Sequence, residues 1–233
     1  MDKFRAYAMK PSWLNFQEFD TPQQQGEDKP PAFIPLKADD VVIDLPDFDF
    51  EYLDTYEAIR TRSSVRKYKE DHMTMEVLSY FLKATLGMRE DDIRFRMSPS
   101  GGARHAIETY IYADRIEGLE EGLYRYHVPT HQLVLIHNET MASHHIKGFM
   151  FNAPCCFMWT AVPYRMYWRY KHCAEKIILL DAGHVCQNLY LVAESIGYGA
   201  CAVGAYDQDK MDNFMKLDGE KEFLIYAAPV GLK

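Results

Sequence analysis

The sequence predicts one mixed α/β domain with an extended arm in front of it, and three observations lead to this prediction. The chain has 233 residues, of which 48% are hydrophobic and 26% charged, which suits a globular protein with a sizeable core. From residue 51 onward, stretches with helical spacing of apolar residues alternate with short runs rich in β-branched and aromatic residues. Residues 1–50 show neither pattern. We therefore expect an N-terminal extended arm over 1–50 and a folded domain over 51–233.

The arm is polar and contains prolines over residues 23–31, and proline favours an extended backbone. Apolar residues follow at Phe33, Ile34 and 41–43. We expect these apolar residues to pin parts of the arm to the surface of the domain.

Two helices are predicted at the start of the domain. The first covers residues 55–62, with Tyr56, Ala58 and Ile59 facing inward. Thr74 is a favourable N-cap for a second helix over 75–86, and the glycine at position 87 ends it.

Strand signals dominate the middle of the chain. Residues 106–113 are a β-rich run, and residues 123–127 and 132–136, separated by a turn, predict a hairpin. A short helix is predicted over 141–150. Residues 156–162 are nearly all apolar, which is typical of a strand buried on both faces. The adjacent Cys155 and Cys156 point to opposite faces of such a strand, and we expect both to be buried.

The longest predicted helix covers residues 176–196 and has two non-solvent stripes. The first stripe is apolar, and the second, containing His184, Gln187, Leu191 and Ser195, is mixed. Two such stripes indicate that the helix is covered on two sides, by its own sheet and by a partner chain. Asp207 then caps a last helix that runs to residue 217, and residues 222–231 form a closing strand.

Composition and motifs exclude several classes of protein. No run of about 18 apolar residues is present, so no membrane-spanning helix is expected. The first residues lack the apolar core of a secretory signal, and the five cysteines suggest no disulfide framework, so we expect a cytoplasmic protein. The net charge of −8 argues against nucleic-acid binding. Neither a zinc-type cysteine spacing nor a metal-binding histidine pattern occurs, and the serine hydrolase motif is missing.

Three segments carry candidate binding residues. Residues 60–68 are strongly basic and contain Arg62, Ser64 and Arg66, whose donors suit phosphate oxygens, although a solvated loop has the same composition. Residues 98–103 place two glycines where backbone can approach a ligand, or where the chain makes a tight turn. Residues 197–205 mostly have small side chains. Such a segment can lie along a flat ligand, or it can pack closely at a crowded connection.

A fourth segment, residues 164–171, is dense in aromatic and cationic side chains and includes Arg169 and Tyr170. Such a segment can stack on an aromatic substrate or provide an acid–base group. An amphipathic surface with snorkelling arginines would show the same pattern.

Taken in order over residues 53–233, these segments resemble the nitroreductase-like FMN flavoproteins, and most closely their SagB-type branch, the thiazoline/oxazoline dehydrogenases. The resemblance implies an α+β fold in which helices wrap a central, mostly antiparallel sheet, and an intertwined homodimer with FMN at its interface. Carried over, it implies that Arg62, Ser64 and Arg66 hold the FMN phosphate and ribityl chain. The remaining implied cofactor residues are Pro99, Ser100 and Gly101, reaching over from the partner subunit, and Val203, Gly204 and Ala205, lying along the flavin ring.

The resemblance also implies the activity, which is hydride transfer to FMN during tailoring of a peptide or small metabolite. Azoline-oxidising relatives use a Lys-Tyr pair, whereas this chain has Arg169-Tyr170 at the matching position. Because arginine is a poor base, Tyr170 is expected to be the acid–base group, with Arg169 orienting the substrate. The electron partner is then oxygen. The alternatives are a nitro- or quinone reductase supplied by NAD(P)H and a non-catalytic flavin-binding partner protein.

Overall fold

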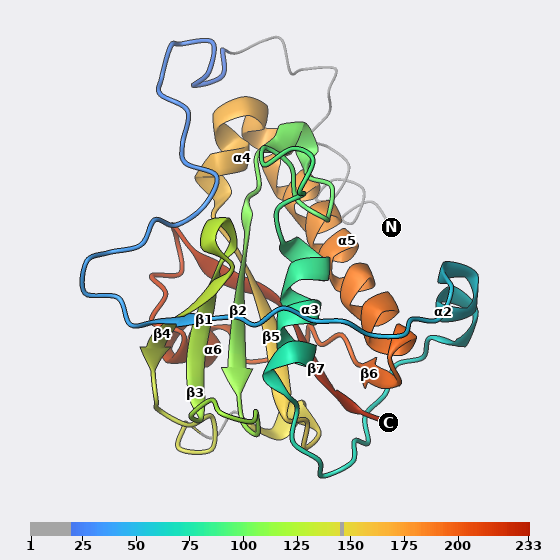
Figure 1. Ribbon diagram of the computed structural model, residues 1–233. Helices are drawn as coiled ribbons and strands as arrows, with labels where there is room; N and C mark the ends of the chain where they lie inside the picture. The colour runs from blue at the N-terminus through green and yellow to red at the C-terminus, as the bar shows by residue number, and fades with distance from the viewer. Residues whose placement is uncertain (1–19, 145–146) are drawn as a thin grey trace, which may run out of the picture.

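The computed structural model describes residues 20–144 and 147–233, and in them a seven-stranded sheet forms the centre of the domain (Figure 1). The strands lie in the order β1-β4-β3-β2-β5-β7-β6, and every neighbouring pair is antiparallel. Their bounds are Val42–Asp44 (β1), Ile107–Ala113 (β2), Gly122–His127 (β3), Gln132–His137 (β4), Cys155–Ala161 (β5), Tyr198–Ala200 (β6) and Phe223–Leu232 (β7). The antiparallel α+β fold is therefore confirmed.

The central strands are buried on both faces, because helices and loops cover both sides of the sheet. Every residue of β2, β3 and β5 is buried. Cys155 belongs to the core on one side of the sheet and Cys156 to the core on the other, as their adjacency predicts. All five cysteines are free and buried.

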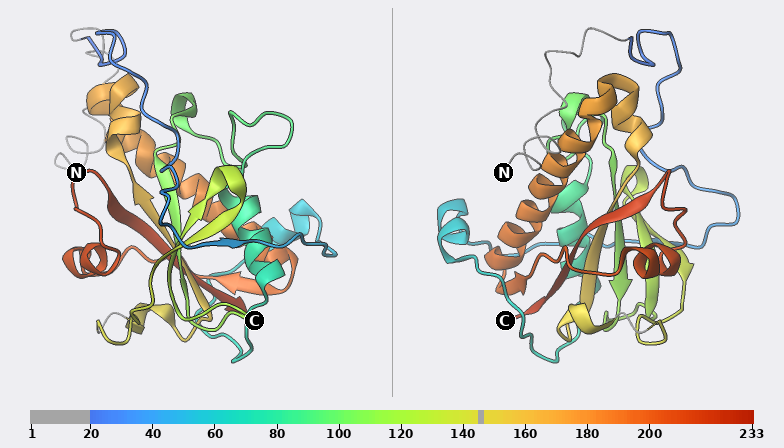
Figure 2. Two further views of the ribbon diagram at one scale, coloured as in Figure 1. Left: turned by 60° about the vertical axis from the view of Figure 1, so that its left-hand side comes forward. Right: turned by 180° about the vertical axis from the view of Figure 1, so that it is seen from behind.

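Helices α3 (Met75–Leu86) and α5 (Ala174–Ser195) pack on one face of the sheet, and α6 (Gln208–Phe214) packs on the other (Figure 2). The predicted caps are present, since Thr74 accepts a hydrogen bond from the Val77 N–H and Asp207 accepts one from the Lys210 N–H. Helix α4 (Pro163–Tyr170) begins with proline at its first turn, where the missing N–H breaks no helical bond.

Helix α5 buries its predicted apolar stripe, which includes Ile178, Val185 and Leu189, against α3 and the sheet. Its other side is open. Leu179 and Leu180 are 60% and 56% exposed, and His184 and Gln187 of the second stripe are also exposed.

Two expectations from the sequence are wrong. In α2 (Thr55–Thr61) only Ala58 is buried, whereas Tyr56 and Ile59 are 71% and 54% exposed. Among the described residues of 141–150 there is no α-helix but a turn followed by a 3₁₀ helix, Lys147–Met150. Helix α2 lies at the surface, where apolar spacing alone does not determine which side is covered. The second segment buries Met141 and Met150 in the core on the α6 side of the sheet without forming a regular helix.

Residues 20–50 run along the domain and add β1 to the edge of the sheet, where it pairs with β4. The backbone carbonyl of Glu27 accepts a hydrogen bond from the Trp168 indole at 3.0 Å, and the Ile34 N–H donates to Glu108 Oε1 at 3.1 Å. Residues 1–19 of the predicted arm lie outside the described residues.

Candidate functional site

The Arg62–Arg66 segment lies at the C-terminal end of α5, immediately after α2. Ser64 forms a parallel bridge with Ala200, and the Val65 N–H donates to the Ala200 carbonyl at 2.9 Å. This pairing fixes the basic segment against β6 and the small-residue segment that follows it. The structure therefore brings two of the three predicted cofactor-binding segments together.

Tyr190 of α5 connects these two segments, and the sequence analysis did not single it out. Its hydroxyl lies 3.1 Å from Ser64 Oγ and accepts a hydrogen bond from the Ala202 N–H at 2.7 Å. The Arg62 guanidinium lies 5.2 Å from the centre of its ring. One tyrosine on a long helix carries no sequence signal that distinguishes it from a packing residue, so only the structure identifies this role.

The arginines of the segment differ in their charge partners. Arg60 is paired with Glu57 at 2.6 Å, whereas within the described residues no carboxylate pairs with Arg62 or Arg66. Arg62 and Arg66 flank Ser64 in the sequence, and two guanidinium groups without a counterion together with a hydroxyl match the donor set that a phosphate dianion requires.

Next to these donors the chain leaves space. Val203 pairs with Ala227 through two backbone hydrogen bonds of 2.7 and 3.1 Å, which fixes the start of the segment. Gly204 and Ala205 are exposed, and a Cβ placed on Gly204 would meet no atom within 4 Å. A flat ring can therefore lie along this backbone, so the residues present fit the FMN that the sequence predicts.

The third predicted segment, residues 98–103, runs along α5 from Asn188 toward the N-terminal end of the helix. The Gly101 N–H donates to Asp181 Oδ2 at 3.1 Å, and the Asn188 amide donates to Ser98 Oγ at 2.9 Å. Ser100 Oγ accepts from the His105 N–H at 3.0 Å. Burial raises the pKa of Asp181, and its hydrogen bonds with Ser100 and Gly101 partly oppose that rise.

The two half-sites do not meet within one chain. Asp181 and Tyr190 mark them on α5, and their separation of nine positions in the sequence corresponds to about 13 Å of helix. The structure therefore does not bring Pro99, Ser100 and Gly101 to the Arg62 cluster of the same protomer. This separation is compatible with the expectation that the loop serves a partner subunit.

Arg169 and Tyr170 end α4 and join the second half-site. A Cβ on Gly102 would lie 2.3 Å from the Tyr170 hydroxyl and 3.2 Å from Arg169 Cδ, so this glycine allows the close approach. The Arg169 guanidinium lies 5.8 Å from the centre of the Tyr170 ring.

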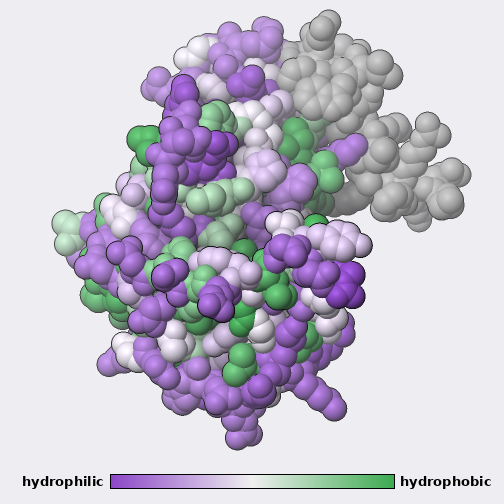
Figure 3. Space-filling view, turned by 45° about the vertical axis from the view of Figure 1, so that its right-hand side comes forward, coloured by the Kyte–Doolittle hydropathy of each residue, from purple (hydrophilic) through white to green (hydrophobic). Residues whose placement is uncertain are grey.

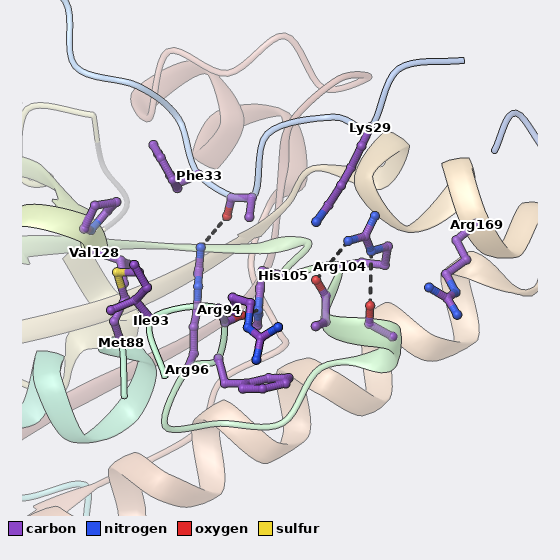
Figure 4. Close-up of a pocket in the computed structure, with 15 residues that line it drawn as sticks. Lys29, Phe33, Met88, Ile93, Arg94, Arg96, Arg104, His105, Val128 and Arg169 are labelled. Carbon is purple, nitrogen blue, oxygen red and sulfur yellow. Dashed lines mark hydrogen bonds between the residues drawn. The ribbon is translucent and has the colours of Figure 1, made fainter. Parts of the chain in front are cut away.

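Two adjoining cavities of about 370 and 830 Å³ open beside Arg169, which lines both. Pro99 and Ser100 line the larger one, so two predicted flavin-contacting residues face open space. The smaller one lies between the arm and the short 3₁₀ helix η2 (Gly101–Ala103) and is shown in Figure 4.

Other kinds of site are not found in the part of the chain that the structure describes. Over residues 20–144 and 147–233, no three His, Cys, Asp or Glu side chains gather as a metal site would require. None of the helices in these ranges is both long and apolar enough to cross a membrane.

The antiparallel sheet with helices on both of its faces defines an α+β fold. The model of the nitroreductase family matches residues 59–232, and the chain belongs to that family. Proteins of this family generally bind FMN and are often dimers.

Individual relatives agree with this assignment. The chain is 31% identical over 201 residues to a candidate nitroreductase of Methanocaldococcus jannaschii, and the match covers 84% of this chain and 98% of that protein. It is 30% identical over 138 residues to the trifolitoxin-processing protein TfxB of Rhizobium leguminosarum, covering 52% of this chain and 35% of that one. A solved structure described as a candidate nitroreductase of Ralstonia eutropha has a TM-score of 0.71 at 25% identity, with coverage of 84% and 91%.

Proposed function

We propose that this nitroreductase-family oxidoreductase is an FMN-dependent dehydrogenase of the SagB type, which acts as a homodimer on a peptide or small metabolite. The observation that carries the proposal is the placement of two complementary half-sites at opposite ends of α5. One half offers Arg62 and Arg66 without counterions, and the other presents the loop that contains Ser100.

A two-fold dimer along α5 would unite the halves, since a symmetric interface places each surface against its counterpart in the partner. The open side of α5 supports this arrangement, because Leu179 and Leu180 are more than half exposed there. Figure 3 shows apolar patches among polar ones on the face of the molecule that carries α5. Tyr56 and Ile59 of α2 add exposed apolar surface near the end of the same helix.

FMN, when bound, supplies a ring that accepts or donates a hydride. Arg62, Ser64 and Arg66 hold its phosphate, and residues 203–205 lie along its ring, while Pro99, Ser100 and Gly101 of the second subunit close the site. The Tyr170 hydroxyl holds or removes the proton that accompanies the hydride, and the Arg169 guanidinium orients an anionic or carbonyl group of the substrate.

The similarity to TfxB supports a tailoring role, since that protein is named for processing trifolitoxin. The relative from Methanocaldococcus favours the second candidate, an NAD(P)H-dependent nitro- or quinone reductase. Steady consumption of NAD(P)H with a quinone, without oxygen-dependent oxidation of any peptide, would decide for the reductase.

The experiment that tests the proposal compares Arg62→Ala with Arg60→Ala. Removing Arg62 deletes a charge-assisted phosphate contact worth roughly 1.5–3 kcal/mol, so FMN should bind roughly 10- to 150-fold more weakly. Arg60 is already neutralised by Glu57, so Arg60→Ala should retain FMN. Flavin fluorescence titration measures both affinities. Equal affinity in the two variants would remove Arg62 from the phosphate site, and a wild-type protein that takes up no FMN would contradict the function itself.

A further inference from the structure

The cavity of about 370 Å³ beside Arg169 has a cationic end. Lys29 of the arm, Arg104 and Arg169 line it there, each from a different segment of the chain (Figure 4). Its lining includes no aspartate or glutamate, and among the described residues no carboxylate forms an ion pair with any of the three. In a chain of net charge −8, such a group of unpaired cations is unusual.

Arg104 is held in place without being neutralised. It is only 6% exposed, and its guanidinium donates to the backbone carbonyls of Gly102 and Ala103, both at 3.2 Å. The same guanidinium stacks over the Trp168 ring at 5.0 Å. These contacts fix its orientation and leave its charge without a counterion.

The electrostatics of neighbouring groups show the same excess of positive charge. Burial lowers the pKa of Arg104, and the nearby Arg169 lowers it further. Burial, followed by the charge of Arg96 and with smaller contributions from Arg104 and Arg165, lowers the pKa of His105 to about 4. An anion entering the cavity would relieve this repulsion.

Two further arginines line the middle of the cavity (Figure 4): Arg94, which is paired with Asp92, and the buried Arg96, which donates to the carbonyls of Ile107 and Ala32. Beyond them the other end of the cavity is mainly apolar. Phe33 and Val128 lie there with Met88 and Ile93, on the side away from Lys29 and Arg169 (Figure 4). Ile93 is 71% exposed, so its apolar surface is accessible to a ligand at this end. The volume is close to the lower end of the range for small-molecule sites and suits a single side chain or ring with its acid group.

We propose that this cavity binds an apolar carboxylate, with the acid group between Lys29, Arg104 and Arg169 and the apolar body against Phe33, Met88 and Ile93. The carboxylate is either the free C-terminus of a peptide that ends in a hydrophobic residue or the acid group of a small aryl or alkyl acid. This inference rests on the proposed function in one respect, since Arg169, which precedes Tyr170 at the end of α4, belongs to both sites and the bound molecule is then the substrate of the proposed reaction. The carboxylate is the feature by which the enzyme selects that substrate.

The test is calorimetric titration of the full-length protein, as purified, with N-acetylphenylalanine and its uncharged amide. The acid should bind at least roughly tenfold more tightly than the amide, because only the acid accepts charge-assisted bonds. Acetate should bind more weakly than N-acetylphenylalanine, because it leaves the apolar end empty. A preference for N-acetylphenylalanine over 3-phenylpropionate identifies a peptide terminus, and equal affinities identify a small acid.

Variants connect the preference to the cavity. Lys29→Gln and Arg104→Gln should each weaken binding of the acid roughly tenfold without changing binding of the amide, and Arg104→Lys should restore only part of the affinity. Lys37→Gln removes another exposed lysine of the arm, outside the cavity, and should have no effect.

Equal affinity for acid and amide would overturn the inference, and so would an unchanged acid affinity in Lys29→Gln, which alters an exposed residue and does not threaten the fold. The flavin absorbance of the same sample separates this result from the proposed function. Protein with FMN and no acid preference overturns only the inference, whereas acid-selective protein that binds no FMN overturns only the proposed function.

Discussion

The two ends of α5 carry half-sites that are built in opposite ways. At the C-terminal end, Gly204 faces open space and Arg62 is partly exposed, and the sheet holds the two segments through Ala200 and Ala227. At the N-terminal end, the loop around Gly102 is packed tightly against α4 and α5. The first half-site is therefore open, whereas the loop of the second half-site is tightly packed.

The backbone at the second end shows how much the packing determines. Gly102, Ala103 and His105 all have a left-handed conformation, with φ of 56°, 51° and 52°. Two of these three residues have side chains, which disfavour that conformation. The hydrogen bonds to Asp181 and Asn188 hold the loop there, and a rigid loop can present Pro99 and Ser100 in one fixed arrangement. Substitutions in the backbone should therefore affect folding more strongly at the second end than at the first.

The largest difference should appear between Gly102→Val and Gly204→Val. A β-branched residue at φ 56° costs about 1–2 kcal/mol, and displacement of the neighbouring Tyr170 and Arg169 side chains adds roughly 1–3. We expect Gly102→Val to lower the free energy of unfolding by roughly 2–5 kcal/mol, as measured by urea denaturation. Gly204→Val enters open space and should change it by less than about 0.5 kcal/mol. Similar losses in both variants would mean that the two ends are equally packed.

His105 should make the second end sensitive to acid. Its pKa is lowered to about 4 from 6.5, chiefly by burial, so below pH 6.5 the unfolded chain binds a proton that the folded chain does not. Stability should therefore fall as the pH falls from about 6.5 to 4, by roughly 2–3 kcal/mol at pH 4.5.

Denaturation of the wild type and His105→Asn at pH 7.5 and 4.5 measures this contribution, because asparagine tolerates the left-handed conformation and does not titrate. The wild type should lose more stability than the variant over this interval. His72→Asn, at an exposed position, serves as the control and should behave like the wild type. Parallel acid sensitivity in wild type and His105→Asn would show that the imidazole is not shielded from protons.

Local sequence patterns predicted individual helices and strands correctly where their caps and apolar periods are clear. The Thr74 cap and the period of the following helix located α3 at its observed bounds, and the apolar run around Cys156 identified β5 as a strand buried on both faces. The sheet order was not accessible in this way, since it depends on contacts between distant segments. The helix over 55–62 shows a second limit. The apolar spacing of Tyr56 and Ile59 predicts a buried side, but both residues are exposed in the structure.

For the candidate site, the types of residue in a segment indicated possible ligands better than the spacing of those residues did. Arg62 and Ser64 are recognisable as anion-binding chemistry, and their neighbour Ala200 fits the small-residue segment. Lys29 and Arg104 were not recognisable, because their common cavity forms only when the arm folds back across the domain. Tyr190 was missed for a similar reason, because its two hydrogen-bond partners lie on separate segments.

The smallest effect is expected for Tyr190→Phe, which tests whether the first end depends on this one hydroxyl. The change leaves the ring under Arg62 and removes the acceptor of the Ala202 N–H. Loss of one such bond should lower the free energy of unfolding by about 0.5–1.5 kcal/mol.

Because the hydroxyl also orients Ser64, FMN affinity should fall in Tyr190→Phe, but by less than in Arg62→Ala, where a charge is lost. Tyr206→Phe removes a hydroxyl that has no hydrogen-bond partner in the described part of the chain, and it should leave the free energy of unfolding within about 0.5 kcal/mol of the wild type. If Tyr190→Phe matched Tyr206→Phe in both stability and flavin affinity, the backbone contacts of Ala200 and Ala227 alone would hold the two segments at the C-terminal end of α5. The Tyr190 hydroxyl would then contribute nothing to this half-site, and the two ends of α5 would differ only in how open they are.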